Sequence, residues 1–246
     1  MISARDFLRG KTAAVFDFDG TLADTLGIWN AVDVQLAAEL GHPNADPEAW
    51  HAFREESLRR HRDEDNPFRS YCGDFGAKLG SSLTAAEIHQ RRFTISRRLL
   101  KNDVQLQPNA AEALKSLKAL GLRLAVATTT RRANIEIYCN TNEGIRREIH
   151  LADVFEGLIC AEDVERIKPD PECYVKALAL LGVTPERAFA VEDTVAGLEA
   201  ARAAGLKCLA MREPHSAEDA ERIRSLSEVY FDDYAAFLKW LGASPL

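Results

Sequence analysis

The sequence contains no apolar run long enough to span a bilayer, and the stretch from Leu120 to Ala127 is interrupted by Arg123. It also lacks an excess of basic residues, because 31 Lys and Arg face 38 Asp and Glu, giving a formal charge of -7. Such a charge gives no electrostatic reason for binding nucleic acid or an anionic membrane. We therefore expect a soluble protein with neither nucleic acid nor a membrane as partner.

Two further absences concern location and redox chemistry. No apolar segment of a secretory signal follows Arg5, Arg9 and Lys11, so we expect a cytoplasmic protein. The five cysteines are scattered, and their spacing suits neither a disulfide framework nor a zinc site. We interpret them as reduced, mostly buried thiols.

The length and composition fit a globular chain with one core domain and a smaller insertion. A length of 246 residues exceeds a typical single domain but is short for two domains with large separate cores. Hydrophobic residues make up 46% and charged residues 28%, which is ordinary for a protein with a buried core. We expect a monomer.

Short apolar runs alternate with amphipathic helical patterns over most of the chain. One helix, from Ala110 to Leu120, is predicted to end at Gly121 in a left-handed conformation. Another is predicted to begin with Asp170 as N-cap and Pro171 in its first turn. The alternation predicts right-handed crossovers and an α/β fold with a doubly wound parallel sheet. The expected strands are 12–17, 122–127, 158–160, 188–191 and 207–209.

The alternation stops in residues 24–105, which look helical and polar, without a convincing strand. We interpret them as an insertion that divides the core into residues 1–23 and 106–246. Thr84 and Glu87 have the spacing of a capping box at the start of one of its helices. The insertion contains many arginines, and we expect most of them to lie on solvated helix faces.

Polar residues follow several of the predicted strands, where ligands of open parallel sheets bind. Asp17 and Asp19 flank one residue beyond the first strand, so both can face one pocket while Gly20 permits a tight bend. Alone, this segment also fits an ordinary turn. The other groups are Thr128, Lys168-Pro169 and Glu192-Asp193.

Together these residues match the requirements of attack on a phosphate ester. An Asp17 nucleophile repels an anionic phosphate by roughly 4 kcal/mol at about 4 Å and an effective dielectric constant of about 20. Mg²⁺, the ammonium of Lys168 and a hydroxyl of Thr128 would offset that charge. The carboxylates suited to the metal are Asp17, Asp193 and Glu192.

The remaining roles concern protons and substrate contacts. Asp19 is placed to protonate the leaving alkoxide and then to take a proton from the hydrolytic water. Thr129 and Thr130 would serve as well as Thr128 for the hydroxyl. Contacts to the substrate are also predicted for Gly20, Thr21 and Thr129.

In this order, Asp-Phe-Asp-Gly-Thr, Thr, Lys-Pro-x-Pro and Glu-Asp resemble the four motifs of the haloacid dehalogenase superfamily. The surrounding segments 127–130, 168–171 and 191–194 resemble the branch that contains beta-phosphoglucomutases and sugar-phosphate phosphatases. The resemblance covers residues 12–25 and 106–210. The insertion resembles the helical cap of that family in position, size and helical character.

The resemblance implies Asp17 as nucleophile, Asp19 as acid and base, and Thr128 and Lys168 as phosphate ligands. It also implies that magnesium is bound by Asp193 and by the backbone carbonyl of Asp19. We therefore expect a magnesium-dependent phosphatase acting on a small phosphorylated metabolite, such as a sugar phosphate.

Four alternatives stay open. A phosphosugar mutase would return the phosphoryl group to a second hydroxyl of the substrate, and no residue of the insertion indicates that step. A dehalogenase needs no second acid, so Asp19 argues against it. A phospho-accepting signalling domain resembles a shorter chain without a cap. A catalytically silent binding protein is disfavoured because every expected catalytic group is present.

Overall fold

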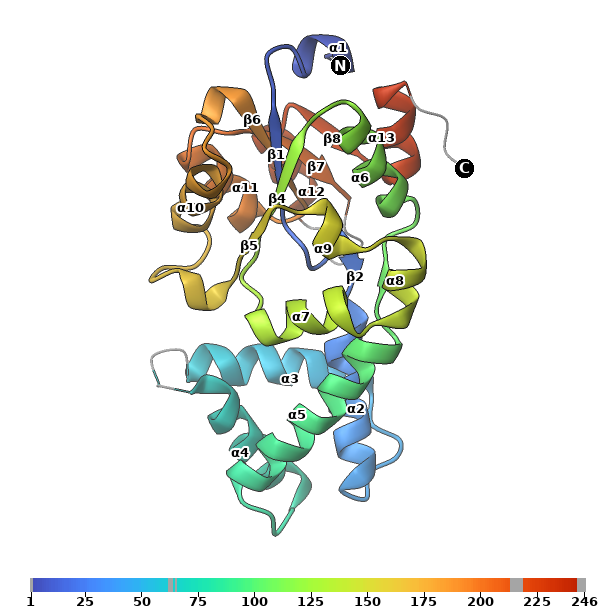
Figure 1. Ribbon diagram of the computed structural model, residues 1–246. Coiled ribbons are helices and arrows are strands. Elements are labelled where there is room, and N and C mark those ends of the chain that lie inside the picture. Colours follow the sequence, from blue (N-terminus) through green and yellow to red (C-terminus); the bar gives the residue numbers. More distant parts are fainter. Residues whose placement is uncertain (1, 62–63, 65, 213–218, 243–246) are drawn as a thin grey trace. The chain divides into compact units, whose positions relative to one another are not determined.

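The computed structural model describes residues 2–61, 64, 66–212 and 219–242. The chain folds into two compact units, which are coloured by sequence in Figure 1. The first unit consists of Met1–Asp24 and Gln105–Leu246, and the second of Thr25–Val104. The short strands β2 (Ala23–Asp24) and β3 (Gln105–Leu106) pair antiparallel where the chain leaves and re-enters the first unit.

The first unit is built on a six-stranded sheet with the order β5-β4-β1-β6-β7-β8. Every pair of neighbouring strands is parallel, which confirms the predicted α/β fold with a parallel sheet. Five strands match the expected runs, and β8 adds a sixth, three-residue strand that the sequence did not reveal. The strands are β1 (Ala13–Phe16), β4 (Arg123–Ala127), β5 (Gly157–Ile159), β6 (Ala188–Glu192), β7 (Lys207–Met211) and β8 (Val229–Phe231).

Helices cover both faces of this sheet (Figure 1). On one face, α10, α11 and α12 pack against small strand residues such as Ala125 and Ala190. On the other, Phe7 of α1 meets Phe189 edge to face at 5.4 Å between ring centroids. The helices of this unit are α1 (Ala4–Phe7), α6 (Ala110–Ala119), α7 (Arg132–Asn140), α8 (Glu143–Glu148), α9 (Leu151–Val154), α10 (Glu172–Leu181), α11 (Val195–Ala203), α12 (Ala220–Leu226) and α13 (Tyr234–Leu241).

Local sequence signals explain most helix ends, with one correction. Gly121 has φ +82° after α6, as expected for a left-handed residue. The predicted N-cap of α10 is wrong by one residue, because Pro171 is the N-cap and the helix begins at Glu172. Asp170 still stabilises this turn, since its carboxylate accepts the backbone N–H of Glu172 at 3.1 Å.

The second unit consists of four helices in its described residues. Thr84 and Glu87 form the predicted capping box, with the N–H of Thr84 donating to the Glu87 carboxylate at 2.8 Å. The core gathers apolar residues from all four helices, including Leu36, Trp50 and Phe75. The helices are α2 (Leu26–Glu39), α3 (Pro47–Arg60), α4 (Pro67–Leu79) and α5 (Ala85–Asn102).

A buried ionic cluster links three of these helices. Asp33 of α2 is fully buried and accepts hydrogen bonds from Arg54 of α3 and Arg92 of α5, the latter at 2.8 Å. Both arginine side chains are more than nine-tenths buried. The expectation of solvated arginines is therefore wrong for Arg54 and Arg92, because a carboxylate from another helix compensates their charge.

Two of the sequence-based expectations about the whole chain can be compared with the fold. All five cysteines are free and buried, as predicted. Among the helices of the described residues, none combines the length and apolarity that crossing a membrane requires.

We predict that Asp33→Asn destabilises the second unit by about 3–5 kcal/mol, because it leaves two buried guanidinium groups with a neutral partner. Urea unfolding followed by tryptophan fluorescence measures this, since two of the three tryptophans, Trp29 and Trp50, lie in this unit. The matched control is Glu56→Gln, which removes one partner of an exposed ion pair with Arg60 and should cost less than about 1 kcal/mol. Equal effects of the two substitutions would contradict the prediction.

Candidate active site

The predicted catalytic residues follow three adjacent strands. Asp17 follows β1, Thr128 follows β4, and Asp193 follows β6. Phe16 of β1 is in register with Val126 of β4 and Val191 of β6, so the three strands end at the same edge of the sheet. The structure thus gathers these residues at the carboxyl ends of the strands, where ligands of parallel sheets bind.

Three carboxylates lie together at this edge. One oxygen each of Asp17, Glu192 and Asp193 lies within 4.8 Å of the others, and all three residues are buried. Burial raises the pKa of Asp17 to about 8, although the Lys168 ammonium opposes the shift. Burial and the charges of Asp17 and Glu192 also raise the pKa of Asp193 well above its usual range. Because three carboxylates lie this close together in a buried place, a divalent cation fits the cluster well.

Lys168 contributes a buried positive charge to the cluster. Its Nζ donates to Asp17 Oδ1 at 2.5 Å and to Glu192 Oε1 at 2.5 Å. Burial alone would lower the pKa of Lys168, but the two carboxylates outweigh it and raise that pKa. The side chain is therefore an ammonium between the predicted nucleophile and Glu192.

Glu192 differs from the two aspartates in how its oxygens are used. Besides Lys168, its Oε1 accepts the hydroxyl of Tyr174 at 2.7 Å, and its Oε2 accepts the backbone N–H of Asp193 at 3.1 Å. A Cβ at Gly197 would lie 1.9 Å from Oε1, so the first turn of α11 rests directly on this carboxylate. Protein donors therefore already occupy both oxygens, and direct metal binding by Glu192 stays a prediction.

Gly20 and Thr21 both lie against the side chain of Asp193. Gly20 has φ +84°, and a Cβ there would lie 2.3 Å from Asp193 Oδ2, so this position requires glycine. The hydroxyl of Thr21 donates to Asp193 Oδ1 at 2.6 Å and is fully buried. The structure places both residues against the metal-binding candidate, while their contact with a substrate remains a prediction.

The threonines after β4 differ in position. Thr128 is buried, and its hydroxyl oxygen accepts the N–H of Thr130 at 3.1 Å. Thr129 is exposed. Thr130 donates its hydroxyl to the Asp19 carboxylate. Sequence reasoning named Thr130 only as a substitute for Thr128 and missed its contact with the predicted acid and base.

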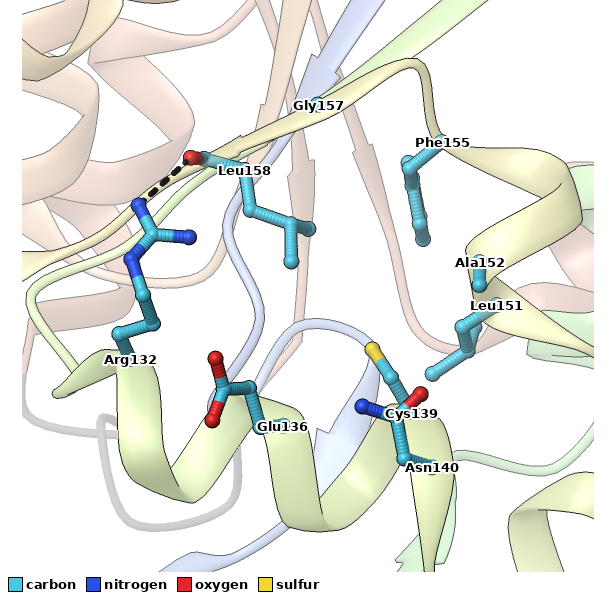
Figure 2. A pocket seen from close by; sticks show the side chains of 9 residues that line it. All are labelled: Arg132, Glu136, Cys139, Asn140, Leu151, Ala152, Phe155, Gly157 and Leu158. Atoms are coloured by element: carbon cyan, nitrogen blue, oxygen red, sulfur yellow. Dashed lines mark hydrogen bonds between the residues drawn. The ribbon is translucent and has the colours of Figure 1, made fainter.

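Two cavities of this unit differ in whether they reach the predicted site. A cavity of about 340 Å³ is bounded by α7, α9 and β5 (Figure 2). Its lining includes Arg132, which donates to the Leu158 carbonyl at 3.4 Å, but none of the predicted catalytic residues. A second cavity of about 170 Å³ is lined in part by Gly20 and Thr21 and so adjoins the site.

The chain is similar to known proteins over most of its length. Residues 14–211 match the family model of the haloacid dehalogenase-like hydrolases. Protein CbbY of Cereibacter sphaeroides is 34% identical over 80% of this chain and 82% of its own length. A phosphorylated carbohydrates phosphatase of Thermotoga maritima is 28% identical over 79% of this chain and 82% of its own.

A solved structure agrees with these sequence matches. Crystalline CbbY of Rhodobacter sphaeroides, in complex with xylulose-(1,5)-bisphosphate, superposes with a TM-score of 0.66 and 28% identity, covering 94% of this chain and 99% of that one. The family match spans the strands that carry Asp17, Thr128 and Asp193, and the relatives extend over nearly the whole fold. On these grounds the chain belongs to the haloacid dehalogenase-like hydrolases.

Proposed function

We propose that this hydrolase is a magnesium-dependent phosphatase that cleaves a small phosphomonoester through a phosphorylated aspartate. The observation that carries the proposal is the buried contact of the Lys168 ammonium with Asp17 Oδ1, beside Asp193 and Glu192. A carboxylate nucleophile with a cation at its side meets the main electrostatic requirement of phosphoryl transfer.

In this mechanism the chain's own residues carry the covalent and proton-transfer steps. An oxygen of Asp17 attacks the phosphorus, and the bond between phosphorus and the ester oxygen breaks. Asp19 donates a proton to the departing alkoxide and then accepts one from the water that hydrolyses the phosphorylated Asp17. Thr128 and Lys168 hold the phosphoryl oxygens meanwhile.

Asp17, Asp193 and the backbone carbonyl of Asp19 would hold the metal. Burial raises the pKa of both Asp17 and Asp193, so their ionised forms are costly without a cation beside them. Bound Mg²⁺ would neutralise that charge and polarise the phosphoryl oxygens. Glu192 would support the site through Lys168 and the backbone of Asp193.

The relatives favour a phosphorylated sugar as substrate. One of them is named as a phosphatase of phosphorylated carbohydrates, and a CbbY structure contains a pentulose bisphosphate. In this mechanism the buried cluster would bind the phosphoryl group, and the choice of alcohol would depend on other residues. We therefore propose sugar phosphates as the first class of substrates to be screened.

A phosphosugar mutase is the alternative that shares the same first step. In that case the phosphoryl group on Asp17 passes to a second hydroxyl of the sugar instead of to water. Phosphorus NMR of the products separates the two functions. Inorganic phosphate supports the phosphatase, and an isomerised sugar phosphate without inorganic phosphate would replace it with the mutase.

We predict that Asp17→Asn lowers kcat for an aryl phosphate in Mg²⁺ by at least about a thousandfold, because the amide is a poor nucleophile. Release of nitrophenol from p-nitrophenyl phosphate measures the rate. Asp153→Asn makes the same chemical change on the exposed surface of α9 and should leave kcat unchanged. Retained activity in purified Asp17→Asn protein would reject Asp17 as the nucleophile.

We also predict that Mg²⁺ binds more tightly as the pH rises from 6 to 8. In the metal-free protein the pKa of Asp17, about 8, lies above its unfolded value of about 4, so ionising it weakens the fold over that range. Mg²⁺ must displace this proton, and its affinity should rise up to about tenfold per pH unit for each proton displaced.

Thermal unfolding with and without Mg²⁺ at pH 6, 7 and 8 measures this dependence. The increase in Tm caused by Mg²⁺ should grow with pH in the wild-type protein and be lost in Asp193→Asn. An increase in Tm that is equal at pH 6 and pH 8 would argue against the carboxylate cluster as the metal site.

A further inference from the structure

Tyr174 on α10 contacts the charged centre in two ways. Its hydroxyl donates at 2.7 Å to Glu192 Oε1, the same oxygen that accepts the Lys168 ammonium. Its ring lies beneath that ammonium, with Lys168 Nζ 5.2 Å from the ring centroid. Tyr174 is fully buried. One side chain from the sheet-covering helix therefore contacts both the lysine and the lysine's carboxylate partner.

The rest of this helix face is apolar. Tyr174 shares it with Ala177, Leu178 and Leu181, which pack on the strands. A phenylalanine would fill the same volume, and a buried hydroxyl is costly unless it is hydrogen-bonded. The hydroxyl is thus explained by its bond to Glu192 rather than by packing.

The donors around Glu192 fix the direction of its carboxylate. Backbone N–H groups of Asp193 and Thr194 bind Oε2, at 3.1 and 3.4 Å, while Tyr174 and Lys168 bind Oε1. Gly197 of α11 also packs directly against the Glu192 carboxylate. A carboxylate held in this way can define the position of a flexible lysine ammonium.

That position matters because Asp17 competes for the same ammonium. If Glu192 did not share it, Lys168 would bind Asp17 alone, neutralising the nucleophile and turning away from a phosphoryl oxygen. Because the Lys168 ammonium lies between two carboxylates and over an aromatic ring, it stays beside Asp17 without pairing with Asp17 alone.

We propose that Tyr174 is a positioning residue that acts through Glu192 to hold Lys168 for phosphoryl transfer, an inference that rests on the proposed phosphatase function. Tyr174 contacts Glu192 and Lys168, and in this proposal it would act on the phosphoryl group only through them. Its role differs from that of Lys168, which binds the phosphoryl oxygens directly.

The test compares Tyr174→Phe, which keeps the ring and removes the hydroxyl, with the wild type in a rapid-mixing experiment. Phosphorylation of Asp17 by p-nitrophenyl phosphate is followed at saturating Mg²⁺ through the burst of nitrophenol. We expect the rate of this step to fall about tenfold, while the Mg²⁺ concentration for half-maximal activity stays the same. Tyr230→Phe, on the edge strand β8, is the matched control and should behave like the wild type.

A double-mutant cycle separates positioning from a general structural effect. If Tyr174 acts through the Glu192 carboxylate, Tyr174→Phe should have no further effect on the rate in a Glu192→Gln background. Equal losses in both backgrounds, or a Tyr174→Phe rate equal to that of Tyr230→Phe, would overturn the inference while leaving the phosphatase intact. A wild-type protein that hydrolyses no phosphomonoester in Mg²⁺ would overturn both proposals.

Discussion

The structure of the site depends on three carboxylates that are buried close together. Asp17 and Asp193 are both buried, and burial is the main reason that the pKa of each is raised; the charge of Glu192 raises both further, and the charge of Asp17 adds to the shift of Asp193. One ammonium, that of Lys168, lies within the cluster. Three carboxylates against one ammonium leave an excess of negative charge, which explains why a cation suits the site. The residues meet there because three adjacent strands end at the same edge of the sheet.

The sequence predicted the sheet well because the apolar runs of parallel strands are buried on both faces and stand out from the polar helices between them. Strand β8 was missed although it is as long as β5, which was predicted, so length alone did not decide which strands the sequence showed. The buried ion pairs of Asp33 were also missed. Its partners, Arg54 and Arg92, lie 21 and 59 residues away, and sequence periodicity does not show which charges meet across a helix bundle.

The spacing of residues in the sequence does not reveal that Glu192 and Asp193 have different roles in the site. Glu192 and Asp193 are neighbours of similar chemistry, and the sequence assigned both to the metal. In the structure, donors from Tyr174, Lys168 and the backbone occupy both oxygens of Glu192, while Asp193 receives the hydroxyl of Thr21 on one oxygen. The hydrogen-bond donors thus distinguish the two carboxylates, and one of these donors, Tyr174, lies on a helix face that is otherwise apolar.

Two glycines show how closely the backbone approaches these carboxylates. At Gly20 an added Cβ would lie 2.3 Å from Asp193, and at Gly197 it would lie 1.9 Å from Glu192. Any side chain at either position would displace Asp193 or Glu192, and Glu192 in turn binds the Lys168 ammonium. The bend at Gly20 was predictable from a glycine directly after Asp19, and its positive φ confirms it, whereas the role of Gly197, inside a regular helix, follows only from the packing of α11 on Glu192. The geometry of the charged groups is therefore fixed in part by positions that carry no side chain at all.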